Sequence, residues 1–77
     1  MFIERTWENG KAELLNLDAG TALRMHEGYP SCWFLEADLG GKVYVLKKNT
    51  SITIIREKYT ELKDQWVGEA AVTVITD

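Results

Sequence analysis

One histidine and one cysteine, His26 and Cys32, are the residues of this sequence best suited to catalysis or metal binding. A catalytic histidine needs a nucleophile and an orienting acid within reach, and a metal-binding histidine needs further ligands. No residue at a recognisable spacing offers His26 either partner, so we expect it on a surface or edge strand. Cys32 precedes Trp33 and Phe34 and has no adjacent basic residue that would favour a thiolate, which is typical of a small core hydrophobe.

Other patterns that could carry chemistry also give no site. Gly40-Gly41 is not expected to cradle a phosphate, because a strand pattern follows it and not the start of a helix. Carboxylates are plentiful, yet no motif pairs two of them as a general acid and base. We therefore predict a non-enzymatic protein with no cofactor and no metal site.

Length and charge limit the class of protein further. We predict one domain, 1–77, because 77 residues with 45% hydrophobic and 27% charged side chains have the balance of a small globular chain. The net charge of −3 argues against nucleic acid as a partner, and the nearest approach to a basic patch, Lys42, Lys47 and Lys48, is interpreted as a solvated strand face.

The sequence also indicates the cellular compartment of the protein. Its apolar runs are far shorter than the roughly 20 residues that span a bilayer, so no membrane span is expected. The opening residues lack a signal-peptide pattern, and a lone cysteine is typical of a reducing compartment. We expect a cytoplasmic protein.

Asn9-Gly10 is the strongest local signal for a β-hairpin, since both residues tolerate the positive φ of a type I′ turn. A two-residue turn at this dipeptide would place Trp7 opposite Ala12 and Arg5 opposite Leu14. Both sides of this hairpin would then carry some apolar residues, and both should be partly covered.

Gly40-Gly41 predicts a second hairpin, over residues 32–48. The predicted pairs on its apolar side are Ala37 with Tyr44, Leu35 with Leu46, and Trp33 with Lys48. A slip of one residue would move the apolar members of these pairs into water, which specifies the register. Between the two hairpins, Asp18 and Gly20 indicate a turn, residues 22–26 a short strand, and Gly28-Tyr29-Pro30 a loop.

Residues 51–66 fit a strand by composition and a helix by spacing. The first half is rich in β-branched residues, which are mediocre helix formers. Apolar residues nevertheless recur in steps of three and four, at Ile52, Ile55, Tyr59, Leu62 and Trp66. We predict a helix over 51–66, begun by Asn49, Thr50 or Ser51 as N-cap and ended at Gly68.

The predicted fold class is α+β. It comprises a small antiparallel sheet built from two hairpins, one C-terminal amphipathic helix packed on it, and a final strand over about 69–76. One helix covers one side of a sheet, whereas the hairpins carry apolar residues on both sides. We therefore expect a partner surface, most simply a second copy of the chain in a homo-oligomer.

Four residues are predicted to contact a partner protein: Arg24, His26, Tyr29 and Trp33. The first three belong to the segment "RMHEGYP", where a flexible glycine and a rigid proline favour an exposed recognition loop over residues 24–30. An ordinary connecting loop is the alternative. Large aromatic residues anchor interfaces, and of the three tryptophans we expect two in the core and one at an interface.

A series of hairpin-turn and strand-core residues, followed by an amphipathic helix, extends over about residues 3–62. Its members are Ile3, Thr6, Asn9-Gly10, Leu15-Asn16, Asp18, Gly41-Lys42, Tyr44-Val45 and Lys47. This series resembles the small flagellar proteins of the FlbD/SwrD type. The sequence departs from them at Ala19-Gly20, over residues 26–34, and in its final strand. The resemblance implies a non-enzymatic accessory protein that acts by contacting other proteins, near the flagellar motor.

Two other functions are compatible with the same residues. The first is a phage- or prophage-encoded inhibitor of a host defence system, which either blocks a host protein as anti-CRISPR proteins do or captures a small signalling molecule. The second is a domain that binds a small ligand between its helix and its sheet. The leading hypothesis remains a regulatory protein-interaction module, itself a homo-oligomer, that binds a partner protein through an apolar sheet face or the loop from Arg24 to Tyr29. Together with the resemblance, these functions imply the cytoplasm of a bacterium or of a phage-infected cell.

Overall fold

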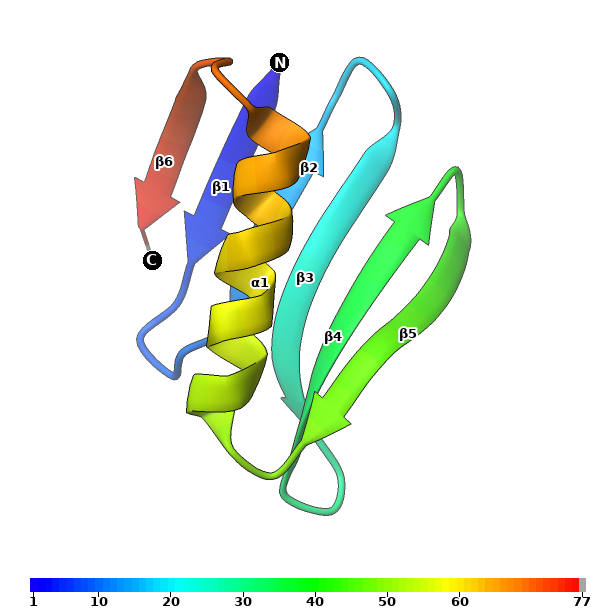
Figure 1. Cartoon of the computed structure of the whole chain (residues 1–77), viewed down its shortest axis with the longest axis vertical. Helices are drawn as coiled ribbons and strands as arrows, with labels where there is room; N and C mark the ends of the chain where they lie inside the picture. Colours follow the sequence, from blue (N-terminus) through cyan, green and yellow to red (C-terminus); the bar gives the residue numbers. More distant parts are fainter. Residues whose placement is uncertain (77) are drawn as a thin grey trace.

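The first 49 residues form a meander of antiparallel strands, because short runs that contain apolar residues are separated by tight turns. The computed structural model describes residues 1–76. In it the strands of the meander are β1 (Phe2–Thr6), β2 (Ala12–Asn16), β3 (Thr21–Gly28), β4 (Cys32–Leu39) and β5 (Lys42–Asn49) (Figure 1). The middle strand, predicted over 22–26, extends by a residue before and two after that range.

Helix α1 (Ile52–Val67) carries the chain from one edge of the sheet to the other, where β6 (Val72–Thr76) pairs with β1. Within residues 1–76, the strands thus form one six-stranded sheet, in the order β5-β4-β3-β2-β1-β6. The α+β class is confirmed. The prediction of an antiparallel sheet built from two hairpins is wrong, because β3 joins both hairpins into one sheet and β6 runs parallel to β1. Along the chain, the helix comes after β5 and before β6, so it is not the C-terminal element.

The parallel pairing follows from the path of the chain. Alternate strands of a meander run in the same direction, so β1 and β5 point the same way. The helix returns the chain to the end of the sheet from which β5 started (Figure 1). The strand after the helix must then repeat the direction of β5, which is also that of β1.

The apolar stripe of α1 lies against the sheet, as its spacing predicts. Ile55 and Tyr59 are buried, and the other members of the stripe are partly buried against the core. Ser51 precedes the helix, and its N–H donates to Oδ1 of Asn49 at 2.8 Å. Gly68 ends the helix with a φ of 59°, and its N–H donates to the carbonyl of Asp64 at 3.0 Å. The predicted range of 51–66 is therefore shifted by one residue.

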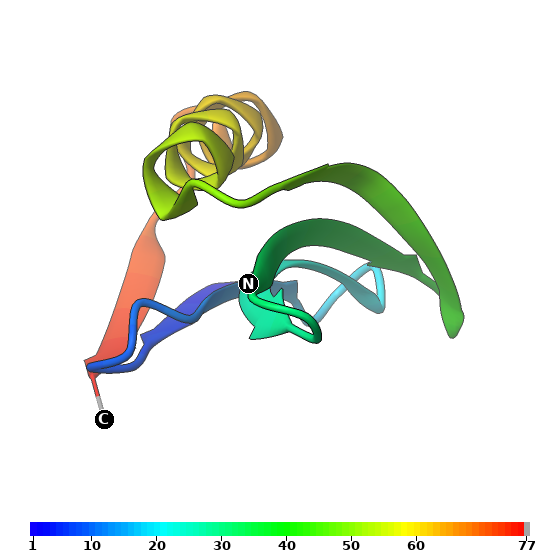
Figure 2. The ribbon, with the colours of Figure 1, turned by 90° about the horizontal axis from the view of Figure 1, so that it is seen from below.

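The core lies between α1 and the middle of the sheet. Figure 2 shows the helix on one face only, with β5 curving away from it and the other face uncovered. The buried core residues are Ala12, Leu14, Leu23, Met25, Trp33, Leu35, Ile55 and Tyr59. Neither the length nor the hydropathy of any helix within residues 1–76 suffices to cross a lipid bilayer.

The turn between β1 and β2 is one residue longer than predicted. The N–H of Gly10 donates to the carbonyl of Trp7 at 3.0 Å, and the N–H of Trp7 donates to the carbonyl of Lys11 at 2.9 Å. This pattern leaves three residues in the loop, and Gly10 takes a positive φ of 97° at its end. Such a loop combines a tight turn with a bulge at the glycine, whereas a type I′ turn would hold only two residues.

The longer turn changes the register of the first hairpin, and the predicted pairs are wrong by one residue. Thr6 pairs with Ala12, and Glu4 pairs with Leu14. Because neighbouring residues of a strand point to opposite faces, Arg5 leaves the face of Leu14 and Glu4 takes its place. A carboxylate thereby comes to lie beneath the helix.

The second hairpin has the predicted register only near its turn. Ala37 pairs with Tyr44 as expected, but the register shifts between Leu35 and Glu36. The pairs beyond the shift are Leu35 with Lys47, Phe34 with Lys48 and Trp33 with Asn49. The predicted pairing of Leu46 with Leu35 is therefore wrong, and Leu46 is exposed. The same shift overturns the predicted pairing of Trp33 with Lys48.

Polar contacts beneath α1 join the first strand to the helix. Glu4 is buried, and its carboxylate accepts a hydrogen bond from the hydroxyl of Tyr59 at 2.7 Å. Nζ of Lys63 donates to both oxygens of the same carboxylate, each at 3.1 Å. Burial raises the pKa of Tyr59 far above its usual value, and the hydrogen bond to Glu4 and its negative charge raise it further. These contacts offset the free-energy cost of removing the Glu4 carboxylate from water.

Replacement of Gly10 by alanine should destabilise the protein more than replacement of Gly20 by alanine. Both glycines have a positive φ, 97° at Gly10 and 64° at Gly20, so both substitutions introduce backbone strain. A Cβ atom at Gly10 would also lie 2.6 Å from Cδ1 of Ile52, whereas at Gly20 it would meet no atom within 4 Å. The tip of Ile52 can shift, but the ring of Trp33 also lies 3.3 Å from this Cβ position. In urea denaturation we expect a loss of about 1 kcal/mol for Gly20→Ala and about 1–2 kcal/mol for Gly10→Ala. Equal losses would contradict the close packing of this turn on the helix.

Tyr59→Phe should change both the stability and its dependence on pH. At neutral pH, Glu4 loses a buried hydrogen-bond donor, and we expect a loss of about 1–3 kcal/mol. The raised pKa means that the folded protein keeps the phenol proton while the unfolded chain releases it above about pH 10. The stability of the native protein therefore falls as the pH rises beyond that value. Denaturation at pH 8, 10 and 11 should show a smaller fall for Tyr59→Phe, and identical slopes would refute this role of Tyr59.

Candidate protein-binding surface

The structure separates the four residues predicted to contact a partner. Arg24 and His26 lie two residues apart on β3 and face away from α1. Tyr29 follows β3 in a turn and is 94% exposed. Trp33 begins the buried side of β4 and belongs to the core under the helix. These residues therefore do not form one surface.

Of the other two tryptophans, Trp66 lies against the core and Trp7 lies at the first hairpin. Trp66 packs against the core from the last turns of α1. Trp7 lies at the end of the first hairpin, where the guanidinium of Arg5 is 4.8 Å from the ring centre and Nζ of Lys11 is 4.4 Å from it. Cations on an indole ring are stabilising, so Trp7 serves the local structure of its own hairpin.

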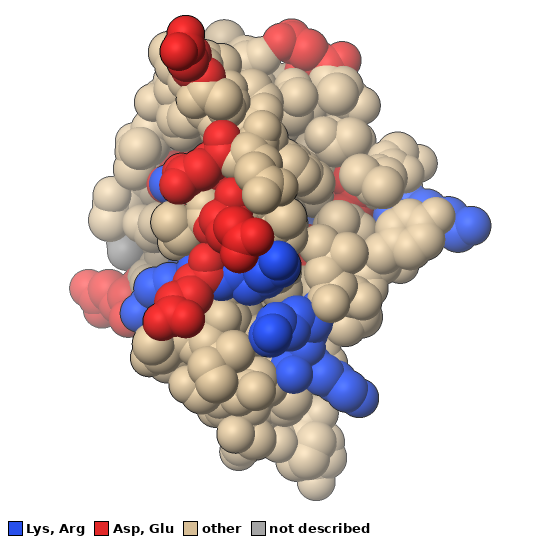
Figure 3. Space-filling view, viewed as in Figure 1, with Lys and Arg blue, Asp and Glu red and all other residues tan. Residues whose placement is uncertain are grey.

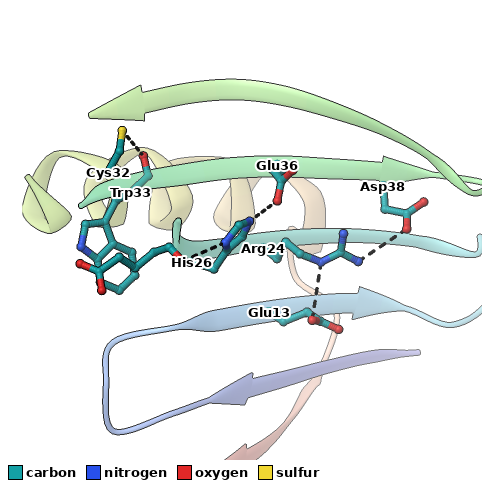
Figure 4. A network of polar contacts seen from close by, with 8 residues as sticks. Glu13, Arg24, His26, Cys32, Trp33, Glu36 and Asp38 are labelled. Atoms are coloured by element: carbon teal, nitrogen blue, oxygen red, sulfur yellow. Dashed lines mark hydrogen bonds and ion pairs between the residues drawn. The ribbon is translucent and has the colours of Figure 1, made fainter. Parts of the chain in front are cut away.

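Arg24 links three strands on the face away from α1 (Figure 4). Its Nε lies 3.6 Å from a carboxylate oxygen of Glu13 on β2, and its Nη2 lies 3.5 Å from one of Asp38 on β4. Glu13 is the direct neighbour of Arg24 across the sheet, while Asp38 is a diagonal neighbour. About a quarter of each of the three side chains is exposed.

His26 makes the next set of contacts along the same face. Its Nε2 contacts the carboxylate of Glu36, which is again the diagonal neighbour on β4 (Figure 4). Its ring stacks on Phe34, the direct neighbour, with 5.8 Å between the ring centres. Nδ1 lies 3.5 Å from the backbone carbonyl of Glu27. The imidazole is thus held by neighbours on its own strand and on β4.

The centre of this face is therefore polar, and its charges are paired within the protein. Removing paired charges from water on contact with an apolar partner costs free energy. We expected the second side of the sheet to be apolar and to need a covering partner, but the centre of this face is not apolar.

Within residues 1–76, no three His, Cys, Asp or Glu side chains come together to hold a metal ion. Cys32 is half-buried, and its Sγ donates to the carbonyl of Trp33 at 3.7 Å.

An exposed apolar surface occurs on the hairpin of β4 and β5. Five large side chains of this hairpin are between 43% and 57% exposed: Leu39, Val43, Tyr44, Val45 and Leu46. We call them the hairpin patch. They point to both faces of the sheet, since Val43 and Val45 alternate with Tyr44 along the strand. Single exposed apolar residues are ordinary, but five of them on one hairpin make it a candidate interaction surface.

The curvature of the sheet explains why both faces of β5 are exposed. Figure 2 shows β5 curving away from the helix. The register shift in this hairpin lies between Leu35 and Glu36, and such an irregularity bends a strand and increases its twist. The helix therefore covers β3 and the start of β4 and leaves the strand that follows in water.

Basic residues flank the hairpin patch. Lys42 lies between Leu39 and the other four residues, and its Nζ is 5.7 Å from the ring centre of Tyr44. Lys47 and Lys48 follow the patch. In Figure 3 the surface over β5 is largely free of charge between lysine and arginine side chains at its two ends, while acidic side chains gather along α1. The exposed acidic residues of the helix are Glu57, Glu61 and Asp64. The helix also carries Arg56, Lys58 and Lys63, so its charges balance, whereas β5 carries only basic charges.

Two hollows accompany these surfaces. A hollow of about 230 Å³ next to Leu39 lies between Phe2 and Trp66, with Asn16 and Thr21 completing its wall. A second, of about 210 Å³, lies on the opposite face beside Arg24 and Asp38. Pockets for drug-sized ligands usually measure about 300–1,000 Å³. The first hollow is large enough for one apolar side chain of a partner, beside the hairpin patch.

Comparison of the chain with protein-family models, with curated proteins and with solved structures found no match. The resemblance to the small flagellar proteins therefore rests on the sequence pattern alone.

The sequence pointed to the loop 24–30 or to an apolar sheet face, but it did not single out the hairpin patch. The signal was present, because "KVYVLKK" has apolar residues at consecutive positions of one strand. One face of such a strand is usually covered by the core, and we assigned Tyr44 and Leu46 to that covered side. The register shift and the curvature of β5, which leave both residues exposed, depend on the packing of the whole sheet.

Arg24→Gln should destabilise the protein more than Lys58→Gln. Arg24 bridges two half-buried carboxylates, whereas Lys58 pairs with Glu61 on the exposed face of α1 at 3.2 Å. We expect a loss of about 1–2 kcal/mol for Arg24→Gln and less than about 0.5 kcal/mol for Lys58→Gln. Thermal denaturation of both variants at low and high salt would measure these losses. A loss at Arg24 no greater than that at Lys58 would show that the three-strand bridge does not stabilise the sheet.

Proposed function

We propose that this protein is a non-enzymatic protein-interaction module that binds a partner protein through the hairpin patch. The observation that carries the proposal is the exposure of five large apolar side chains on one hairpin, with both faces of β5 open. Burial of apolar surface is the main driving force of protein association, at about 25 cal/mol per Å² removed from water. Tyr44 is the natural anchor, since tyrosine is enriched among residues that dominate binding energy.

The flanking lysines favour an acidic partner. Lys42, Lys47 and Lys48 surround the apolar residues, and Lys48 is directly opposite Phe34 in the sheet. Positive charge at the rim of an interface steers association and selects partners of the opposite sign. We therefore propose a partner segment with apolar residues between Asp or Glu residues. One of its apolar side chains enters the hollow beside Leu39 and Trp66.

The proposal moves the binding site away from the four residues that the sequence suggested. Arg24 and His26 are already paired with carboxylates, and Trp33 is committed to the core. Tyr29 stays a prediction, since its exposed ring lies in a different turn. The resemblance to flagellar accessory proteins and the alternative of a phage-encoded inhibitor both involve contact with another protein, so the hairpin patch fits either setting. Capture of a small molecule is less favoured, because both hollows are small.

A photo-crosslinking amino acid at Val45 should form an adduct with a partner protein in the source cells. The same amino acid at Ile54 provides a matched control, since Ile54 is also exposed and apolar but lies on α1. We expect a specific adduct from position 45 and none from position 54. In addition, Tyr44→Ala should weaken partner capture about tenfold or more while the far-ultraviolet circular dichroism stays unchanged. Adducts from both positions alike, or from neither, would refute the proposal.

A further inference from the structure

The outer edge of β6 differs from ordinary sheet edges. β6 pairs with β1 on one side and has no neighbour on the other within residues 1–76. Its sequence, "VTVIT", contains only β-branched residues, with no charge, proline or glycine. An exposed edge strand offers unpaired N–H and C=O groups to any other strand, and proteins usually block such edges with lysine, proline or a bulge. β6 has none of these.

The opposite edge has the protection that β6 lacks. β5 carries Lys42, Lys47 and Lys48, and the register shift interrupts its pairing with β4. It also curves away from the plane of the sheet (Figure 2). Each of these features opposes the addition of another strand to β5. One edge of the sheet is therefore blocked, and the other is open.

We propose that a second copy of the chain pairs with the free edge of β6, antiparallel and across a two-fold axis at Val74. This arrangement places Val74 opposite Val74 of the second copy, and Thr73 opposite Ile75 of the second copy. The paired strands carry no charge, so two identical edges meet without repulsion between like charges. Both sheets become one continuous sheet, with both helices on the same face.

A second copy fits this edge better than a charged partner strand does. An acidic or basic strand would find no side chain of opposite charge on residues 72–76. The copy also covers apolar residues on both faces of the sheet. Val74, which is 59% exposed, lies on the same face as Glu4, and Ile75, which is 42% exposed, lies on the other face beside Arg5. Pairing of copies at this edge uses no residue of the hairpin patch and does not depend on its function.

Light scattering after size-exclusion chromatography would test the pairing directly. The native protein should approach twice the 8.8 kDa of one chain as its concentration rises. Val74→Lys places two like charges opposite each other at the two-fold axis, so this variant should stay at the mass of one chain. Its side chain is exposed, and its circular dichroism should match that of the native protein. Ile54→Lys, on the outer side of α1, is the control and should still form dimers.

A mixture of two variants tests the register. Val74→Lys and Val74→Glu should each be monomeric alone and should form a heterodimer when mixed, because opposite charges then meet at the axis. Backbone amides of residues 72–76 should also exchange more slowly at high protein concentration, while those of β5 should not change. A native protein that stays monomeric would overturn the proposal. So would dimers that persist in Val74→Lys, which would point to the hairpin patch, or a mixture that does not associate.

Discussion

One helix cannot cover a six-stranded sheet, and most features of this protein follow from that mismatch. An α-helix with its side chains is about 10–12 Å wide, whereas six strands spaced about 4.8 Å apart extend over roughly 24 Å. The helix therefore buries the middle strands and leaves most side chains of the two outermost strands exposed. The two edges have opposite designs: β5 is basic, bent and apolar on both faces, and β6 is uncharged and regular.

The face without a helix is stabilised in a different way. Its middle strands carry Arg24 between two carboxylates and His26 in contact with Glu36, so these polar side chains find partners on neighbouring strands. Cross-strand pairs of this kind contribute roughly 0.2–1 kcal/mol each, and they also make the face unattractive to apolar surfaces. Polar groups under the helix are also paired, since the buried carboxylate of Glu4 accepts hydrogen bonds from Tyr59 and Lys63.

Local patterns predicted the elements well and their arrangement less well. The stripe from Ile52 to Trp66 defined the helix to within one residue, although its first turn is rich in β-branched residues. The hairpins were found from their glycines, but the bulge at Gly10 and the register shift near Leu35 changed which residues face the helix. The parallel pairing of β6 has no local signal, because it depends on where the helix returns the chain. The exposure of the hairpin patch follows from the same long-range geometry and was missed for that reason.

The pairing of the first strand with the last one has a consequence for biosynthesis. β1 leaves the ribosome early, yet the strand that completes its outer side is Val72–Thr76. Until those residues have left the ribosome, the nascent chain presents the open side of β1 to its surroundings, and contacts between such distant segments form slowly. A nascent or prematurely terminated chain is therefore at risk of aggregation along β1, and protection by a ribosome-associated chaperone would matter most in that interval.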